Sequence, residues 1–254
     1  MSLSGKVAVI TGAGSGIGRS TSILFSQLGA KVVLVGRRAE PLNGTLSELE
    51  DKRGLAVQAD VSKAGDAQRI VRETIREFGK LDVLVNNAGV EAPCKPVTDL
   101  TEEEWDYVVD INLKGVFLCS KYAIPEMRKN RHGVITNVAS NWGIIAAPCA
   151  SAYCASKAGV ILLTKAMAMD AANDGITVNC ICPGDTNAGM EFRDLARFTE
   201  ERRAAIIPKL IPVEEIAHGI LYLVSDQARM ATGTVLVIDN GASSGEAGRL
   251  LSIK

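Results

Sequence analysis

A tyrosine and a lysine four residues apart are the first side chains in this sequence that could do chemistry together. Tyr153 and Lys157 stand in the stretch Tyr-Cys-Ala-Ser-Lys, and on a helix this spacing places both on one face. A phenol has a pKa near about 10, and a neighbouring ammonium lowers that pKa by favouring the phenolate. Such a phenol could exchange a proton with a carbonyl or an alcohol near neutral pH. Taken alone the pair is weak, because surface residues also share this spacing by chance.

A glycine-rich turn near the N-terminus points to a phosphate ligand. Residues 11–18 read Thr-Gly-Ala-Gly-Ser-Gly-Ile-Gly, directly after an apolar run and before a helical pattern. Glycines let backbone N–H groups approach a pyrophosphate, and the helix N-terminus adds donors and a favourable dipole. We expect a dinucleotide here, with a ligand-free structural turn as the alternative. The chain lacks the Gly-Lys-Ser/Thr ending of a triphosphate-binding loop. The predicted contacts are Gly12, Ser15, Gly16, Ile17 and Gly18.

The end of the second apolar run bears on which dinucleotide binds. Folds that bind NAD usually have an acidic residue there for the ribose hydroxyls, whereas this chain has Gly36, Arg37 and Arg38. Guanidinium groups can pair with a 2′-phosphate through charge-assisted contacts. The sequence therefore predicts that NADP(H) is preferred and that NAD(H) is the alternative cofactor. The competing interpretation is that both arginines are solvated surface charges.

The elements that must position these groups alternate between strand and helix along the chain. Seven short apolar runs predict buried strands at residues 7–10, 31–35, 55–59, 81–85, 134–138, 177–182 and 235–238. Helical spacing predicts helices between them, including residues 40–51, a helix that passes through Asn112 to about Lys129, 151–172 and 213–224. This order is typical of an α/β fold, a doubly wound (Rossmann) parallel sheet of about seven strands with helices on both faces.

The domain organisation follows from the same pattern. No repeat, linker or shift of composition marks a boundary, so we expect a single dinucleotide-binding and catalytic domain over residues 1–254. Residues at about 185–212 lack clear periodicity, and we expect them to form a mobile substrate loop.

Composition and charge exclude several classes of protein. The 254 residues are 47% hydrophobic and 22% charged, and the net charge is -1. We therefore expect a folded domain that binds no nucleic acid. No apolar run reaches the roughly 18 to 20 residues of a membrane span, and the N-terminus lacks a signal-peptide pattern. We expect no membrane partner and a cytoplasmic location. The six cysteines and two histidines lack metal-ligand spacing, so we expect no metal and reduced, mostly buried cysteines.

Together, these motifs resemble the short-chain dehydrogenase/reductase family over roughly Leu3 to Gly241. The matching pieces beyond the glycine turn and the Tyr/Lys pair are Asp60-Val61, Asn86-Asn87-Ala88-Gly89, Asn112, Ser140 and Pro183-Gly184. Their order and spacing follow the family pattern. The resemblance implies the Rossmann fold, a nicotinamide cofactor and an activity on a carbonyl or alcohol.

The resemblance also implies a role for each matching residue. Tyr153 would be the acid/base that protonates the substrate oxygen, and Ser140 would hydrogen-bond the same oxygen. Lys157 would lower the pKa of the phenol and bind the nicotinamide ribose, and Asn112 would hold a water of a proton relay. Each of these residues also has a purely structural alternative, as a turn, cap or core residue. The further cofactor contacts would be Asp60, Val61, Asn87, Ala88, Gly89, Pro183, Gly184 and Thr186.

The chain departs from the family pattern at two places. A threonine that contacts the nicotinamide carboxamide usually stands where this chain has Ala188, and Thr186 is the candidate to replace it. Asn240 stands where a glycine is usual. The segments that line family substrate pockets mix apolar and polar residues here, including Trp142, and they do not choose among a sugar, a keto-acyl thioester, a cyclic ketone and a steroid-like alcohol.

The sequence thus predicts an oxidoreductase that transfers a hydride between NADP(H) and a small-molecule carbonyl or secondary alcohol. One alternative is an epimerase or dehydratase on the same fold, which the roughly 70 residues after Pro183 disfavour. The other is a non-catalytic nucleotide-binding protein, which the retained Tyr153 and Lys157 disfavour. The helix at 151–172 is apolar on several sides, and with the family resemblance this predicts a homotetramer.

Overall fold

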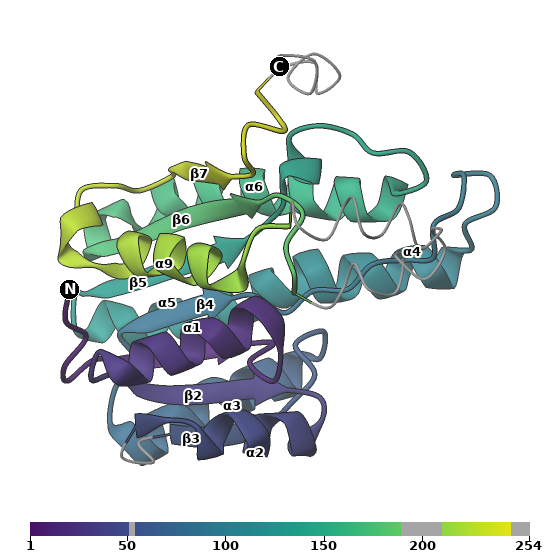
Figure 1. Ribbon diagram of the computed structural model, residues 1–254. Helices are drawn as coiled ribbons and strands as arrows, with labels where there is room; N and C mark the ends of the chain where they lie inside the picture. Colours follow the sequence, from purple (N-terminus) through teal and green to yellow (C-terminus); the bar gives the residue numbers. More distant parts are fainter. Residues whose placement is uncertain (51–53, 189–209, 245–254) are drawn as a thin grey trace.

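Seven parallel strands form one sheet in the order β3-β2-β1-β4-β5-β6-β7 (Figure 1). The computed structural model describes residues 1–50, 54–188 and 210–244. The strands are β1 (Val7–Thr11), β2 (Lys31–Gly36), β3 (Gly54–Gln58), β4 (Val83–Asn86), β5 (Gly133–Val138), β6 (Ile176–Pro183) and β7 (Val235–Ile238). The predicted fold class, a single-domain doubly wound sheet, is confirmed, and each predicted strand boundary lies within two residues of the observed one.

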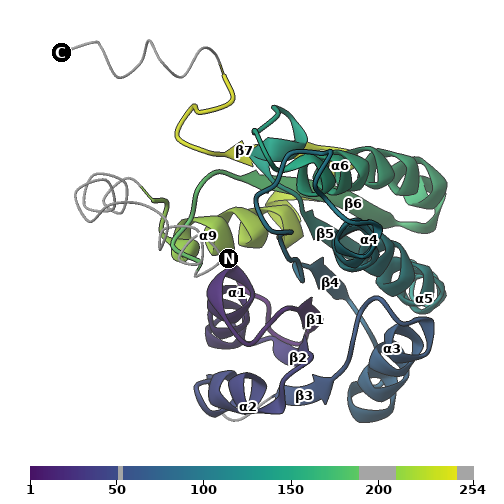
Figure 2. The same cartoon turned by 90° about the vertical axis from the view of Figure 1, so that its right-hand side faces the viewer.

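Helices cover both faces of the sheet (Figure 2). On one face lie α1 (Gly16–Gln27), α2 (Ala39–Ser47) and α9 (Val213–Val224). On the other face lie α3 (Ala64–Phe78), α5 (Gly115–Lys129) and α6 (Ser151–Ala171). Alternate residues of each strand enter different cores: in β2, Val33 and Val35 pack on the α3 side, whereas Val32 and Leu34 pack on the α1 side. This double burial explains why the strands appear in the sequence as nearly continuous apolar runs.

The helix predicted to pass through Asn112 to about Lys129 is confirmed, and it contains a π-helical turn at Asn112. Helix α4 (Glu102–Val109) begins at Thr101, whose hydroxyl accepts from the Glu104 N–H in a capping box. A π-helical turn, Asp110–Lys114, then precedes α5. The turn adds one residue to the helical repeat and carries Asn112 inward, where its side chain is buried.

Two further expectations concern the substrate loop and the cysteines. Of the predicted substrate loop at 185–212, residues 189–209 lie outside the described part, while Thr186 and Ile211 pair in a short parallel bridge. The six cysteines form no disulfide, as predicted, but only Cys119, Cys180 and Cys182 are buried. The expectation of mostly buried cysteines is therefore wrong for the other three, two of which line a surface pocket described below.

Over the described ranges, no helix is long and apolar enough to cross a membrane.

Candidate active site

The glycine turn lies where β1 ends and α1 begins, at the carboxyl edge of the sheet. Gly12 has φ +69, and a Cβ there would lie 2.8 Å from the Asn87 side-chain nitrogen. A Cβ on Gly18 would collide with the carbonyl oxygen of Gly12. Both positions therefore require glycine, and the turn lines a cleft with Gly12 and Ser15.

Two adjoining cavities run along this edge. One, of about 650 Å³, lies over the ends of β1, β2 and β3. The other, of about 170 Å³, lies between the turn and α6. They share Gly12, Ser15, Ala88, Gly89 and Ala188 in their linings, so together they form one extended cleft. An extended cleft with a glycine turn at its middle fits a dinucleotide, because each cavity can take one half of such a molecule.

Most of the residues predicted from the sequence line this cleft. The larger cavity is lined by Gly12, Ser15, Arg37, Arg38, Asp60, Val61, Ala88 and Gly89. The smaller cavity is lined by Gly12, Ser15, Gly16, Ile17, Asn87, Ala88, Gly89, Ser140, Tyr153, Lys157, Pro183, Gly184 and Thr186. Two predicted residues do not line it: Gly18 packs beneath the turn, and Asn112 lies behind the cleft wall.

Arg37 has a partner that sequence analysis missed. Its Nη2 donates to the Tyr107 hydroxyl at 3.2 Å, and its guanidinium lies 5.8 Å from the centroid of the same ring. Tyr107 comes from α4, and nothing in the local sequence links it to Arg37. The contact holds the guanidinium at the rim of the larger cavity. Asp60, on the same cavity, accepts from the N–H and hydroxyl of Ser62, which is the turn role weighed for it above.

Lys157 is buried at the inner end of the smaller cavity. Its Nζ donates to the Val138 carbonyl at 2.9 Å and lies 5.5 Å from the centroid of the Tyr153 ring. Burial lowers the pKa of Lys157 to about 8, against opposing effects of nearby groups that include the Glu91 carboxylate. The predicted Tyr/Lys pair thus faces one cavity from one side of α6.

Ser140 comes to the same cavity from the end of β5. It precedes a short 3-10 helix, Asn141–Gly143, and its Oγ accepts from the Trp142 N–H at 3.2 Å. The side chain of Ser140 is buried. The indole of Trp142 in turn meets the Tyr153 ring edge-on, with centroids 5.9 Å apart and an interplanar angle of 88°. Two hydroxyls, of Ser140 and Tyr153, therefore line one cavity together with a buried ammonium.

Asn112 braces the site from behind. Its Oδ1 accepts from the Val90 N–H and its Nδ2 donates to the Val90 carbonyl, both at 2.8 Å. Nδ2 also donates to the Ser156 hydroxyl at 3.1 Å. A Cβ on Gly89 would lie 3.3 Å from Lys157 Nζ and 3.4 Å from Asn112 Oδ1, so these two side chains are neighbours. These bonds give Asn112 a structural role, and its proton-relay role stays a prediction.

The Asn86-Asn87 pair does more than form a turn. Asn86 Nδ2 donates to Asn137 Oδ1 at 2.8 Å and to the Ser120 hydroxyl at 3.1 Å, inside the core. Asn87 Nδ2 donates to the carbonyl of Thr11 at 2.8 Å. One asparagine therefore joins β4 to β5, and the other fixes the glycine turn against the end of β4.

The two departures from the family pattern also lie near the cleft. Thr186 is buried, and both it and Ala188 line the smaller cavity, so the cavity has a threonine despite the shifted position. Asn240 has φ +54, a left-handed conformation. Among non-glycine residues asparagine tolerates this region well, which accounts for its presence where a glycine is usual.

The chain is similar to known proteins along nearly its whole length. Residues 6–196 match the family model described as short chain dehydrogenase. A 3-oxoacyl-[acyl-carrier-protein] reductase FabG of Thermotoga maritima is 40% identical over 248 residues, covering 95% of this chain and 99% of the relative. The crystal structure of levodione reductase superimposes with a TM-score of 0.91 at 34% identity, covering 96% and 99%. A 3-ketoacyl-(acyl-carrier-protein) reductase from Brucella melitensis, complexed with NADH, gives 0.87 at 36% identity, covering 95% and 100%.

Proposed function

The chain belongs to the short-chain dehydrogenase/reductase family, and on this premise we propose that it transfers a hydride between NADP(H) and a carbonyl or secondary alcohol. The observation that carries the proposal is the single cavity lined by Ser140, Tyr153, Lys157 and the glycine turn. Retention of both Tyr153 and Lys157 favours catalysis over the alternative of a non-catalytic nucleotide-binding protein.

The bound nicotinamide would supply or accept the hydride, and the protein would orient the reacting atoms. In the direction of reduction, the Tyr153 hydroxyl gives its proton to the substrate oxygen as negative charge develops there. The Ser140 hydroxyl donates a hydrogen bond to the same oxygen and stabilises that charge. In the direction of oxidation, the Tyr153 phenolate takes the proton from the alcohol.

Lys157 supports the proton transfer through its charge. The ammonium lies over the Tyr153 ring and stabilises the phenolate that remains after the proton has left. Its hydrogen bond to the Val138 carbonyl holds the ammonium at a fixed place in the cavity. Because Lys157 is buried, its charge acts on the phenol through a medium that screens it less than water does.

The proposed activity is tested by mixing NADPH or NADH with a panel of ketones and aldehydes and following the loss of reduced-nicotinamide absorbance. We expect turnover by the unmodified protein, and a loss of at least about a hundredfold in kcat for Tyr153→Phe, because the general acid is removed. Tyr222→Phe, an exposed tyrosine of α9, is the matched control and should retain full activity. Full activity of Tyr153→Phe would contradict the proposal.

The preference for NADP(H) rests on Arg37 and Arg38 at the rim of the larger cavity. A hydrogen bond to a charged group contributes roughly 1.5–3 kcal/mol, so Arg37→Gln should weaken NADPH binding by about one to two decades in Kd. Binding of NADH, which lacks the 2′-phosphate, should change much less. Arg72→Gln, at an exposed arginine of α3, is the control.

Equal affinity of the unmodified protein for both cofactors, or equal losses in Arg37→Gln, would refute the NADP(H) assignment. A converse variant adds Gly36→Asp to the Arg37 change, which supplies a ribose acceptor and repels the phosphate. A Cβ on Gly36 would lie 3.2 Å from Leu42 Cδ2, so this variant requires a small shift of Leu42. The single Arg37 variant is therefore the cleaner test.

We also propose the homotetramer predicted from the sequence. Leu162 and Met169 of α6 are 68% and 80% exposed, and Phe117 of the adjacent α5 is 46% exposed. Apolar side chains gathered on neighbouring helices are typical of a contact surface between subunits. Sedimentation at micromolar concentration tests this, and a stable monomer would contradict it. The cytoplasmic location stays a prediction.

A further inference from the structure

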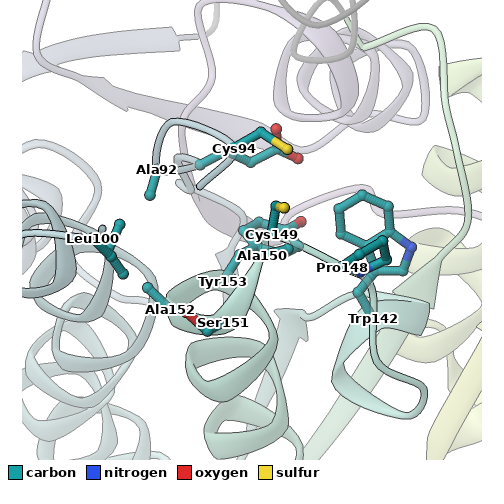
Figure 3. Close-up of a pocket in the computed structure, with 11 residues that line it drawn as sticks. Ala92, Cys94, Leu100, Trp142, Pro148, Cys149, Ala150, Ser151, Ala152 and Tyr153 are labelled. Carbon is teal, nitrogen blue, oxygen red and sulfur yellow. The ribbon is translucent and has the colours of Figure 1, made fainter. Parts of the chain in front are cut away.

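A small cavity of about 40 Å³ lies beside the Tyr153 ring, next to the dinucleotide cleft (Figure 3). Its walls come from the loop that follows β4, with Ala92 and Leu100, and from the segment between β5 and α6, with Trp142 and Pro148. The lining is mostly apolar, and Glu91 carries the only charge among the described residues that form it. Tyr153 lines both this cavity and the one that holds Ser140 and Lys157.

We propose that Trp142 determines substrate specificity by limiting the group that enters this cavity to a short alkyl substituent. The inference rests on the proposed function, because it requires a carbonyl oxygen at the Tyr153 hydroxyl. A carbonyl carbon carries two substituents close to that oxygen. Since Tyr153 forms part of both cavities, one substituent lies within reach of the small apolar cavity.

The volume sets the size of the substituent. A cavity needs about 10–15 Å³ to hold one water, and a cavity of about 150 Å³ holds benzene. The cavity of about 40 Å³ therefore has room for an ethyl or propyl group, whereas a phenyl ring would have to extend beyond it. The indole of Trp142 is the largest side chain on the wall, so it occupies the space that a ring would need.

Trp142 is held in place from two directions. Its backbone N–H donates to the Ser140 hydroxyl at 3.2 Å, and its indole packs edge-on against the Tyr153 ring. The next residue, Gly143, lies so close to α6 that a Cβ there would be 2.7 Å from the Lys157 carbonyl carbon. The short helix that carries Trp142 is thus packed directly on α6, so its backbone cannot approach α6 more closely without displacing Lys157.

The Glu91 carboxylate also affects which substituents can bind in this cavity. Glu91 lines both this cavity and the larger part of the dinucleotide cleft. An anionic substituent would be brought close to this carboxylate in an otherwise apolar surrounding, which disfavours its binding. A neutral alkyl group gains from burial against Leu100, Trp142 and Pro148.

The test compares kcat/KM for 4-heptanone and benzophenone, with the preferred cofactor, in the unmodified protein and in three variants. Each of these ketones carries two identical substituents, so a propyl or a phenyl group must face the cavity in either orientation. We expect the unmodified protein to prefer 4-heptanone. Trp142→Ala should raise the ratio of benzophenone to 4-heptanone by at least about tenfold, because one methylene in a pocket already changes discrimination by roughly 10–200-fold. Trp142→Phe, which keeps an aromatic ring, should change the ratio less.

The ratio separates size selection from a positioning effect. Loss of the edge contact to Tyr153 would lower kcat/KM for both ketones alike and leave their ratio unchanged. Leu100→Trp, at a residue that lines this cavity and neither cavity of the dinucleotide cleft, adds side-chain volume, and it should lower kcat/KM for 4-heptanone at least about tenfold while that for acetone changes less. This third variant keeps the test decisive if Trp142→Ala does not fold.

The two hypotheses fail in different ways. If the unmodified protein reduces no carbonyl of the panel with either cofactor, the proposed function is wrong and the inference falls with it. If ketones are reduced but benzophenone is preferred by the unmodified protein, or the ratios do not change in Trp142→Ala and Leu100→Trp, only the inference is overturned.

Discussion

Replacing Lys157 with methionine measures the free energy of burying its ammonium. Burial lowers the pKa of this side chain from 10.5 to about 8. Between these two values the unfolded chain keeps its proton while the folded protein has released it. The contribution of Lys157 to the free energy of unfolding therefore rises with pH between about 8 and 10.5. It is fully present above pH 10.5, and it is lost as the pH falls through about 8.

The size of the effect follows from the two pKa values. Each pKa unit corresponds to about 1.4 kcal/mol, so the whole shift amounts to about 3 kcal/mol, of which about 2.5 kcal/mol is expressed between pH 7 and pH 10. The methionine variant has no such group. It also leaves the Val138 carbonyl without its donor, and that cost is the same at every pH. The difference in unfolding free energy between the two proteins should therefore move by about 2.5 kcal/mol in favour of the unmodified protein as pH rises from 7 to 10.

Urea denaturation of the cofactor-free proteins at several pH values from 7 to 10 measures this difference. Lys165→Met, at an exposed lysine of the same helix, is the matched control for exchanging a lysine of α6 for methionine. A change below about 0.5 kcal/mol for Lys157→Met over the same range would refute the reasoning, because it would mean that the ammonium is not desolvated by the fold.

Three further changes have defined outcomes. Glu91→Gln should lower the pH at which the Lys157 contribution to the unfolding free energy begins to rise in the same denaturation experiment, because the carboxylate raises the pKa of that lysine. An unchanged pH range would show that the two charges do not interact. Asn112→Ala should lower the free energy of unfolding by about 2 kcal/mol, since it removes the partner of the Val90 N–H and carbonyl, and a loss within error would contradict the bracing role. Asn240→Ala should cost about 1 kcal/mol in thermal denaturation while Asn240→Gly is nearly neutral, because φ is +54; equal stabilities of both variants would argue against strain there.

Much of the fold and part of the candidate site could be predicted from the sequence because their causes are local. The five inner strands are mostly buried on both faces, and all seven strands appear as apolar runs whose ends match the observed strands within two residues. The turn at 11–18 carries glycine where the backbone is left-handed or too close to a neighbour for a side chain. The spacing of Tyr153 and Lys157 needs only helical geometry to bring both to one cavity.

Only the tertiary structure decided which distant residues meet. Arg37 and Tyr107 are 70 positions apart, Asn112 and Val90 are 22 apart, and the π-helical turn that carries Asn112 inward follows no sequence pattern that distinguishes it from an α-helix. The exposure of Cys94, the partial burial of Cys149 and the edge contact of Trp142 with Tyr153 likewise depend on how the loops after β4 and β5 pack over α6. Sequence propensity and periodicity depend on residues that are close together in the chain. The contacts named above form only when complete helices, strands and loops pack against one another, and that packing sets the shape of the substrate cavity.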